Sequence, residues 1–209
     1  MAAAIIAASQ DVSDNAGSLF LKFSKGDWSY GADQTEVETG SEWAVNPTSI
    51  RTGYQCWGKD QTPDSGTLLG ERLAPIGAVI DANELPQHAN GKWQPAVSLQ
   101  MRCASGEDEG LQVEWGSCSV GGVKAYKEQL LAPIGAKLQA GDTACVPVVK
   151  LETDFYMHKD KAIGKVKFPV FKLVRWMDMD GEAEEVADEV VEEASVEEPK
   201  PQRRRRAKA

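Results

Sequence analysis

The 209-residue chain has few of the residues from which metal and catalytic sites are usually built. It contains two histidines, His88 and His158, and no CxxC, HxxxH or HxE arrangement that would give the ligand spacing of a zinc site. The pattern GxxxxGK followed by Ser or Thr is also absent, which excludes the common phosphate-binding loop. We therefore expect no enzyme activity and no metal or other cofactor.

The cysteines and the first residues indicate the cellular setting. Four cysteines, at 56, 103, 118 and 145, are spread too widely for a disulfide scaffold, so we expect reduced and mostly buried thiols. The opening MAAAIIAASQ has a short apolar run without a preceding positive charge, too brief for a signal peptide or a membrane span. These features predict a cytoplasmic protein without a membrane partner.

Composition divides the chain into three parts. Residues 1–18 are small and polar and predict a flexible N-terminal arm, whereas residues 19–177 have the size of one globular domain. Residues 178–209 predict a disordered acidic tail, with eleven acidic and six basic side chains and a final run of four arginines at 203–206. The net charge of −9 leaves the body mildly acidic, which excludes a globally basic clamp but permits a local basic stripe.

The domain has the pattern of many short strands. In LFLKFSKGDWSYG, apolar and polar side chains alternate before Lys25, Gly26 and Asp27 supply turn chemistry, which predicts a hairpin. The pattern continues in TEVETGSEWAVNP, SIRTGYQCWGK, AVSLQMRCA, LQVEWGSCS, VPVVKLETDFYMH and KVKFPVFKLVRWMD. Seven or eight such strands predict a mainly β fold, and more specifically an OB-like small barrel of short antiparallel strands.

Two segments interrupt this pattern. QTPDSGTLLGERLAPIGAVIDANELPQHANGKWQP is rich in Pro, Gly and Asn, and we expect a long ordered loop there. GGVKAYKEQLLAPIGAKLQAG predicts the single α-helix, ending at Gly141, with a kink or break at Pro133. The hexapeptide LAPIGA occurs in both segments, at 73–78 and 131–136, either by duplication or by coincidence.

Aromatic and basic residues lie close together at several places in the chain. Aromatic rings can stack on unpaired bases at about 1–3 kcal/mol each, and neighbouring cations neutralise phosphates. Lys165, Lys167 and Phe171 share one parity along a predicted strand, so we expect them on one face. For any single ring or lysine, a place in the core or on a solvated face is the alternative. The combined pattern predicts a single-stranded DNA track in which Trp28, Tyr30, Tyr54, Trp57 and Trp93 stack on bases and Lys22, Lys25, Arg51, Lys59, Lys165, Lys167 and Arg175 contact phosphates.

The tail suggests a second element of the same function. A tethered polyanion would occupy a basic groove until a longer polyanion displaces it, which makes DNA binding reversible and salt-sensitive. The freed tail would then recruit replication proteins. The terminal arginines could instead bind phosphate or fold back on the acidic run, and a merely solubilising extension is an equal alternative.

Several segments resemble a family of bacteriophage proteins from replication and recombination gene neighbourhoods. The matching residues are GDWSYG, SEWAVNP, GYQCWG, GGVKAY and VPVVKLETDFYMHKDKAIGKVKFPVFKLVRW, which cover most of residues 19–177. The plan of a β-rich body with an acidic tail is also similar to that of phage single-stranded-DNA-binding proteins built on the OB-fold. The resemblance implies a role in phage DNA replication or recombination in the host cytoplasm.

Together these features predict non-sequence-specific binding of single-stranded DNA, with phage replication proteins as partners of the tail and homo-oligomers as a further option. The first alternative is a protein-interaction or structural phage accessory module whose aromatics form a protein interface. The second is an enzyme with an unrecognised site near His158 or Cys118.

Overall fold

The structure is a computed structural model that describes residues 19–161, 164–179 and 183–184. The predicted N-terminal arm and nearly all of the predicted acidic tail lie outside these residues.

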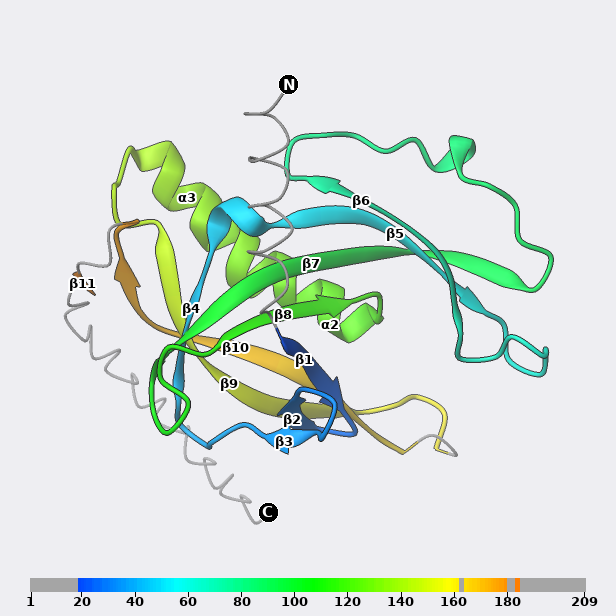
Figure 1. The fold of residues 1–209 in the computed structure, drawn as a ribbon, viewed down its shortest axis with the longest axis horizontal. Helices are drawn as coiled ribbons and strands as arrows, with labels where there is room; N and C mark the ends of the chain where they lie inside the picture. The colour runs from blue at the N-terminus through cyan, green and yellow to red at the C-terminus, as the bar shows by residue number, and fades with distance from the viewer. Residues whose placement is uncertain (1–18, 162–163, 180–182, 185–209) are drawn as a thin grey trace, which may run out of the picture.

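The described residues form a curled, mixed sheet of eleven strands (Figure 1). The strands are β1 (Leu19–Ser24), β2 (Asp27–Tyr30), β3 (Thr35–Glu36), β4 (Glu42–Val45), β5 (Arg51–Gly58), β6 (Leu68–Pro75), β7 (Gly91–Ser105), β8 (Gln112–Ser117), β9 (Val146–Met157), β10 (Lys165–Met177) and β11 (Ala183–Glu184). Their order is β11-β10-β9-β4-β7-β8-β1-β2-β3, and β5 and β6 branch from β7. The prediction of a mainly β fold is confirmed.

The sheet does not close into the predicted OB-like barrel. It curls until the β1–β2 turn meets β9, but side chains rather than a ladder of the described strands make the contact. Trp28 Nε1 donates to the Glu152 carbonyl at 3.0 Å, and Thr153 Oγ1 donates to the Gly26 carbonyl at 2.7 Å. In addition, β1 pairs in parallel with β8, so the expectation of antiparallel strands throughout is wrong.

The core fills the concave side of this curl. Alternate residues of the strands point inward, as the twofold period of a strand requires, and Trp43 and Trp115 are the largest fully buried side chains. The Phe171 ring meets the Trp115 ring edge to face, with centroids 4.9 Å apart. Such rings contribute large buried areas, so the centre of the curl provides much of the hydrophobic stabilisation of the domain.

A continuous helical segment lies against the core. It consists of α2 (Val120–Ala125), a π-helical segment η3 (Tyr126–Leu131) and α3 (Ala132–Ala140), and it ends at Gly141 with φ of 77°, as predicted. We expected a kink or a break at Pro133; no break occurs, and the helix departs from α geometry directly before the proline. The wider π-helical turn directly before the proline accommodates its missing N–H and its ring, so the helix continues.

This helix also covers the free edge of β10. Gln129 Oε1 accepts a hydrogen bond from the backbone N–H of Phe171 at 2.7 Å. Further along, a Cβ built on Gly121 would lie 3.0 Å from Phe168 Cβ, so only glycine lets α2 approach β10 so closely. The helix therefore satisfies an edge that would otherwise present unpaired backbone groups.

The predicted long loop contains a strand, which corrects that expectation. β6 pairs with β5 along its whole length, and Pro75 stands at its last position, where the missing N–H removes no interior hydrogen bond. The first LAPIGA therefore ends a strand, whereas the second lies inside the helical segment.

Two projections extend from the curled body to the same side (Figure 1). The first, which we call the arm, consists of β5, β6 and the first half of β7. Because β5 and β4 pair with the same edge of the fifteen-residue β7, the arm continues the body sheet. The second, which we call the hairpin tip, is the part of β9 and β10 between Asp154 and Phe168.

Candidate nucleic-acid interface

Trp28 was predicted to stack on a base, but it belongs to the core. Its side chain is 7% exposed and its ring packs edge-on against Phe23 at 5.0 Å and Phe171 at 5.7 Å. Phe171 is buried as well, although it shares a face with Lys165 and Lys167 as expected. Both rings lie where the curl is filled, so neither can receive a base.

Tyr30 and Arg175 are committed to acidic partners. Tyr30 Oη donates to Asp108 Oδ1 at 2.7 Å, and this hydrogen bond is the main reason that the pKa of Tyr30 rises to about 12. Arg175 forms a half-buried ion pair with Glu42. Releasing Arg175 for a phosphate would leave Glu42 as an uncompensated charge, so its predicted role in DNA binding is corrected to a structural one.

The predicted residues of the arm are divided between two faces. Trp93 pairs with Cys56 across β5 and β7, which places it on the same face as Tyr54, whereas Trp57 points to the opposite face. Trp93 Nε1 donates to the Pro86 carbonyl at 2.8 Å. The arm therefore does not present its three rings as one track.

The Trp57 indole and the Lys59 ammonium also make hydrogen bonds within the arm. Trp57 Nε1 donates to Gln55 Oε1 at 3.2 Å, and Lys59 Nζ donates to the Ala89 carbonyl at 3.2 Å. Arg51 is exposed beside Pro75 and Glu114, on a part of the sheet away from the hairpin tip. These residues are not brought together with the cations of β1 and β10.

The hairpin tip carries two exposed aromatic rings that stand beside lysines. Phe155 is 48% exposed and Tyr156 is 49% exposed, and as neighbours in β9 they point to opposite faces. Lys165 Nζ lies 3.4 Å from the centre of the Phe155 ring, close enough for a cation–π interaction.

The β1–β2 turn adds cations to this surface. The Lys167 side chain runs over Gly26, and the φ of 101° at this position favours glycine in the turn. The neighbouring Lys25 has a φ of 56°, and its side chain is exposed, as is that of Lys22 in β1. Four of the seven predicted phosphate contacts, Lys22, Lys25, Lys165 and Lys167, thus belong to one end of the molecule.

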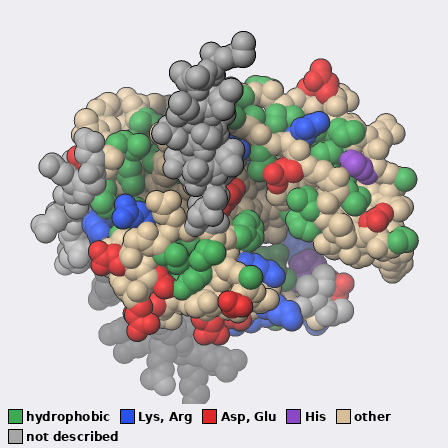
Figure 2. Space-filling view, viewed as in Figure 1, with side chains coloured by type: hydrophobic (Ala, Val, Ile, Leu, Met, Phe, Trp, Pro, Cys, Tyr) green, Lys and Arg blue, Asp and Glu red, His purple; other side chains and the backbone are tan. Residues whose placement is uncertain are grey.

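Acidic residues border the same surface. Figure 2 shows Lys and Arg side chains at the lower right, where Figure 1 draws the two hairpins, with Asp and Glu side chains along the lower edge. Within the tip, Asp154 and Asp160 are exposed, while Glu152 is paired with Lys172 at 3.2 Å. Binding of a polyanion is therefore favoured along a narrow strip of the surface and not across a broad basic face.

The sequence prediction missed the rings of the tip itself. In the sequence, Phe155 and Tyr156 are adjacent and interrupt the alternation of ETDFYMH near the end of a predicted strand. Two adjacent rings so close to a strand end could have identified them as surface residues. Phe168, whose ring lies 6.2 Å from that of Tyr156, was not among the predicted DNA-binding residues either.

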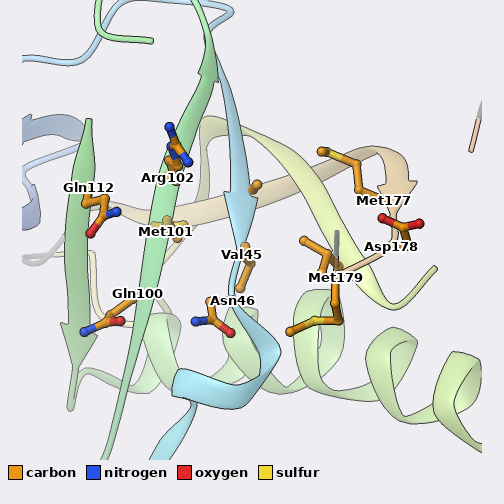
Figure 3. Close-up of a pocket in the computed structure, with 11 residues that line it drawn as sticks. Val45, Asn46, Gln100, Met101, Arg102, Gln112, Met177, Asp178 and Met179 are labelled. Carbon is orange, nitrogen blue, oxygen red and sulfur yellow. The ribbon is translucent and has the colours of Figure 1, made fainter. Parts of the chain in front are cut away.

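A separate pocket of about 360 Å³ lies at the other end of the sheet (Figure 3). The amides of Asn46, Gln100 and Gln112 face the side chains of Met177 and Met179 across it. None of the predicted DNA-binding residues lines it. Arg102 and Asp178 also line it, so the pocket combines one cation and one carboxylate with amide and thioether groups rather than presenting a cluster of cations.

The described residues offer little to metal or thiol chemistry. They contain no cluster of three His, Cys, Asp or Glu side chains that could hold a metal ion. Burial raises the pKa of the Cys118 thiol, which lowers the thiolate fraction at neutral pH and makes this cysteine a poor nucleophile. No helix in the described part of the chain is both long and apolar enough to cross a bilayer.

Comparison of the chain with models of known protein families, with curated proteins and with solved structures found no match.

Proposed function

We propose that the protein binds single-stranded DNA without sequence specificity, using the hairpin tip and the β1–β2 turn. The observation that carries this proposal is the exposed Phe155 ring at the open end of the concave sheet face, with Lys165 against it and Lys167 and Lys25 beside it.

The arrangement of rings suits unpaired bases. Phe155, Lys165 and Lys167 lie on the concave face, which is filled by the core further inward but is open at the tip. Tyr156 lies on the opposite face, beside Phe168. A strand that crosses the tip could stack bases on either side, and such stacking is sequence-tolerant because every base has a π-face.

The arrangement of charges favours the same strip. A lysine next to an aromatic ring can neutralise the phosphate that follows a stacked base. The acidic residues along the neighbouring edge repel DNA phosphates, so they confine the DNA strand to the strip of lysines. A duplex hides its base faces, and we expect it to bind more weakly.

The test is fluorescence anisotropy with a labelled oligo-dT and a series of salt concentrations. We expect the affinity to fall steeply with salt. A Lys165→Glu/Lys167→Glu variant should lose at least about tenfold in affinity, and the slope of log affinity against log salt should fall by the equivalent of about two phosphate contacts. The matched control, Lys59→Glu/Arg72→Glu, makes the same charge change on the arm and should stay near wild type. Equal losses in the two variants, or no binding at low salt, would contradict the proposal.

The setting and the tail complete the proposal. The resemblance supports a role in phage DNA replication or recombination in the host cytoplasm, and the acidic tail would act as a competitor for the lysines and a hook for replication proteins. Adding the tail as a free peptide should then weaken DNA binding at low salt.

The second candidate is a protein-interaction or structural accessory module. The observation that favours it is an apolar groove beside α2, described below, in which Val120 is 89% exposed. Native mass spectrometry with and without single-stranded DNA separates the two candidates, because only the first predicts a DNA complex.

A further inference from the structure

A groove of about 460 Å³ separates α2 from the first half of β7. Its apolar lining includes Trp93 and Pro95 of the arm and Val120 and Val123 of the helix. Val120 is 89% exposed and Val123 is half-buried beside this hollow, so the surface gains from an apolar partner.

The rim of this groove is basic. Lys92, Lys124 and Lys127 line it, with Glu128 as its one acidic residue. Lys124 lies 3.9 Å from Glu128, a long and exposed pair, whereas among the described residues no carboxylate pairs with Lys92 or Lys127. The groove is therefore suited to a partner that is apolar on one side and acidic on the other.

The chain itself contains such a segment, outside the described residues. Between positions 186 and 194, the sequence VADEVVEEA has four acidic side chains and no basic one. Its apolar residues, Val186, Ala187, Val190, Val191 and Ala194, recur at the three- and four-residue spacing that would align them on one face of a helix. An acidic amphipathic segment of this kind can order as it lays its apolar face in a groove.

The tail of the same molecule begins too far away to be this partner. Glu184 pairs with Trp176, whose ring lies 5.6 Å from Lys137 Nζ near the end of α3. Val120 stands seventeen residues earlier on the helix, about 25 Å away at 1.5 Å per residue. Two extended residues beyond Glu184 span about 7 Å, and a helix over 186–194 would add only about 12 Å. Figure 1 likewise draws β11 and the arm at opposite ends of the molecule.

We propose that residues 186–194 of one copy bind the groove between α2 and β7 of a second copy. The valines would pack on Val120, Val123 and Pro95, and the carboxylates would face the unpaired lysines. Because groove and tail are different surfaces, the contact is head to tail and can add further copies. The inference does not depend on DNA binding, and its test contains no DNA.

The experiment measures the mass of full-length chains by sedimentation velocity over a range of concentrations. We expect wild type to associate as concentration rises, and both Lys92→Glu/Lys127→Glu (groove) and Val190→Asp/Val191→Asp (tail) to associate at least about tenfold more weakly. The control Lys59→Glu/Arg72→Glu changes the same charge on the arm outside the groove and should behave as wild type.

A mixture of the two defective variants provides the decisive measurement. The groove variant retains its tail and the tail variant retains its groove, so the mixture should form a one-to-one pair that neither variant forms alone. That recovery also demonstrates that the tail variant keeps a folded groove. Wild type that stays monomeric at every concentration, association unchanged in either variant, or a mixture without pairing would each overturn the proposal.

Discussion

The arm and the hairpin tip are both projections of the same sheet that carry aromatic rings, but their side chains are used differently. In the arm, Trp57 and Trp93 donate their indole N–H groups to neighbours within the arm. At the tip, Phe155 and Tyr156 are exposed beside lysines. An aromatic beside a lysine in the sequence is therefore accessible to a ligand only where the surrounding fold neither buries it nor hydrogen-bonds it.

The largest effect should come from removing the rings of the tip. A Phe155→Ala/Tyr156→Ala variant should lose about 1–3 kcal/mol of DNA-binding free energy for each base that no longer stacks, with unchanged unfolding in urea. Anisotropy with oligo-dT measures the loss. Tyr54→Ala on the arm is the control, and an equal loss there would remove the distinction between the two projections.

An intermediate effect should come from the close packing of the arm. A Cβ on Gly53 would lie 2.0 Å from the Arg72 carbonyl oxygen and 2.9 Å from Ile80 Cδ1, so Gly53→Ala must displace β6. We expect a loss of about 1–3 kcal/mol in unfolding free energy, with faster hydrogen exchange in β5 and β6 but not in β9.

A glycine in the helix supplies the matched control for this change. Gly135 has nothing within 4 Å of its would-be Cβ, so Gly135→Ala should be neutral or stabilise by up to about 1 kcal/mol, because alanine favours the helix. If both substitutions destabilised equally, contact with Arg72 and Ile80 would not be the cause.

The smallest effect should be a change in folding stability at alkaline pH, which arises from Tyr30 and Asp108 at the acidic edge near both hairpins. The pKa of Tyr30 is raised to about 12 by its hydrogen bond to Asp108, so the folded state holds this proton more tightly than the unfolded state. The corresponding stability is complete below the unfolded pKa near 10 and is lost as pH rises toward 12. Urea unfolding at pH 9 to 11 should therefore show a shallower decline for Tyr30→Phe than for wild type; identical slopes would contradict this origin.

Local patterns predicted much of the fold. The β1–β2 hairpin followed from alternation around Lys25-Gly26, and the helix end followed from Gly141. The two LAPIGA copies mark the limit of such reasoning, because the same six residues end a strand at one site and continue a helix at the other. Pairing with β5 decides the first case and packing of Ile134 in the core decides the second.

The candidate site was predictable only in part, for a similar reason. Parity along β10 correctly grouped Lys165 with Lys167, since a strand fixes which side chains share a face. Parity does not say how far the core extends along that face, so Phe171 and Trp28 were assigned to the surface. The place where the core ends depends on contacts between β2 and β9, which are distant in sequence.

The anchoring of the β9–β10 pair has a mechanical consequence. One edge is fixed by Trp28 and Gly26 at Glu152 and Thr153, and the other by Gln129 at Phe171. Beyond these points the two strands extend from the body, anchored at their base and without such contacts at their end. Thermal bending should therefore concentrate at Phe155 and Tyr156, which can tilt to follow an irregular ligand while Trp115 and its neighbours remain undisturbed.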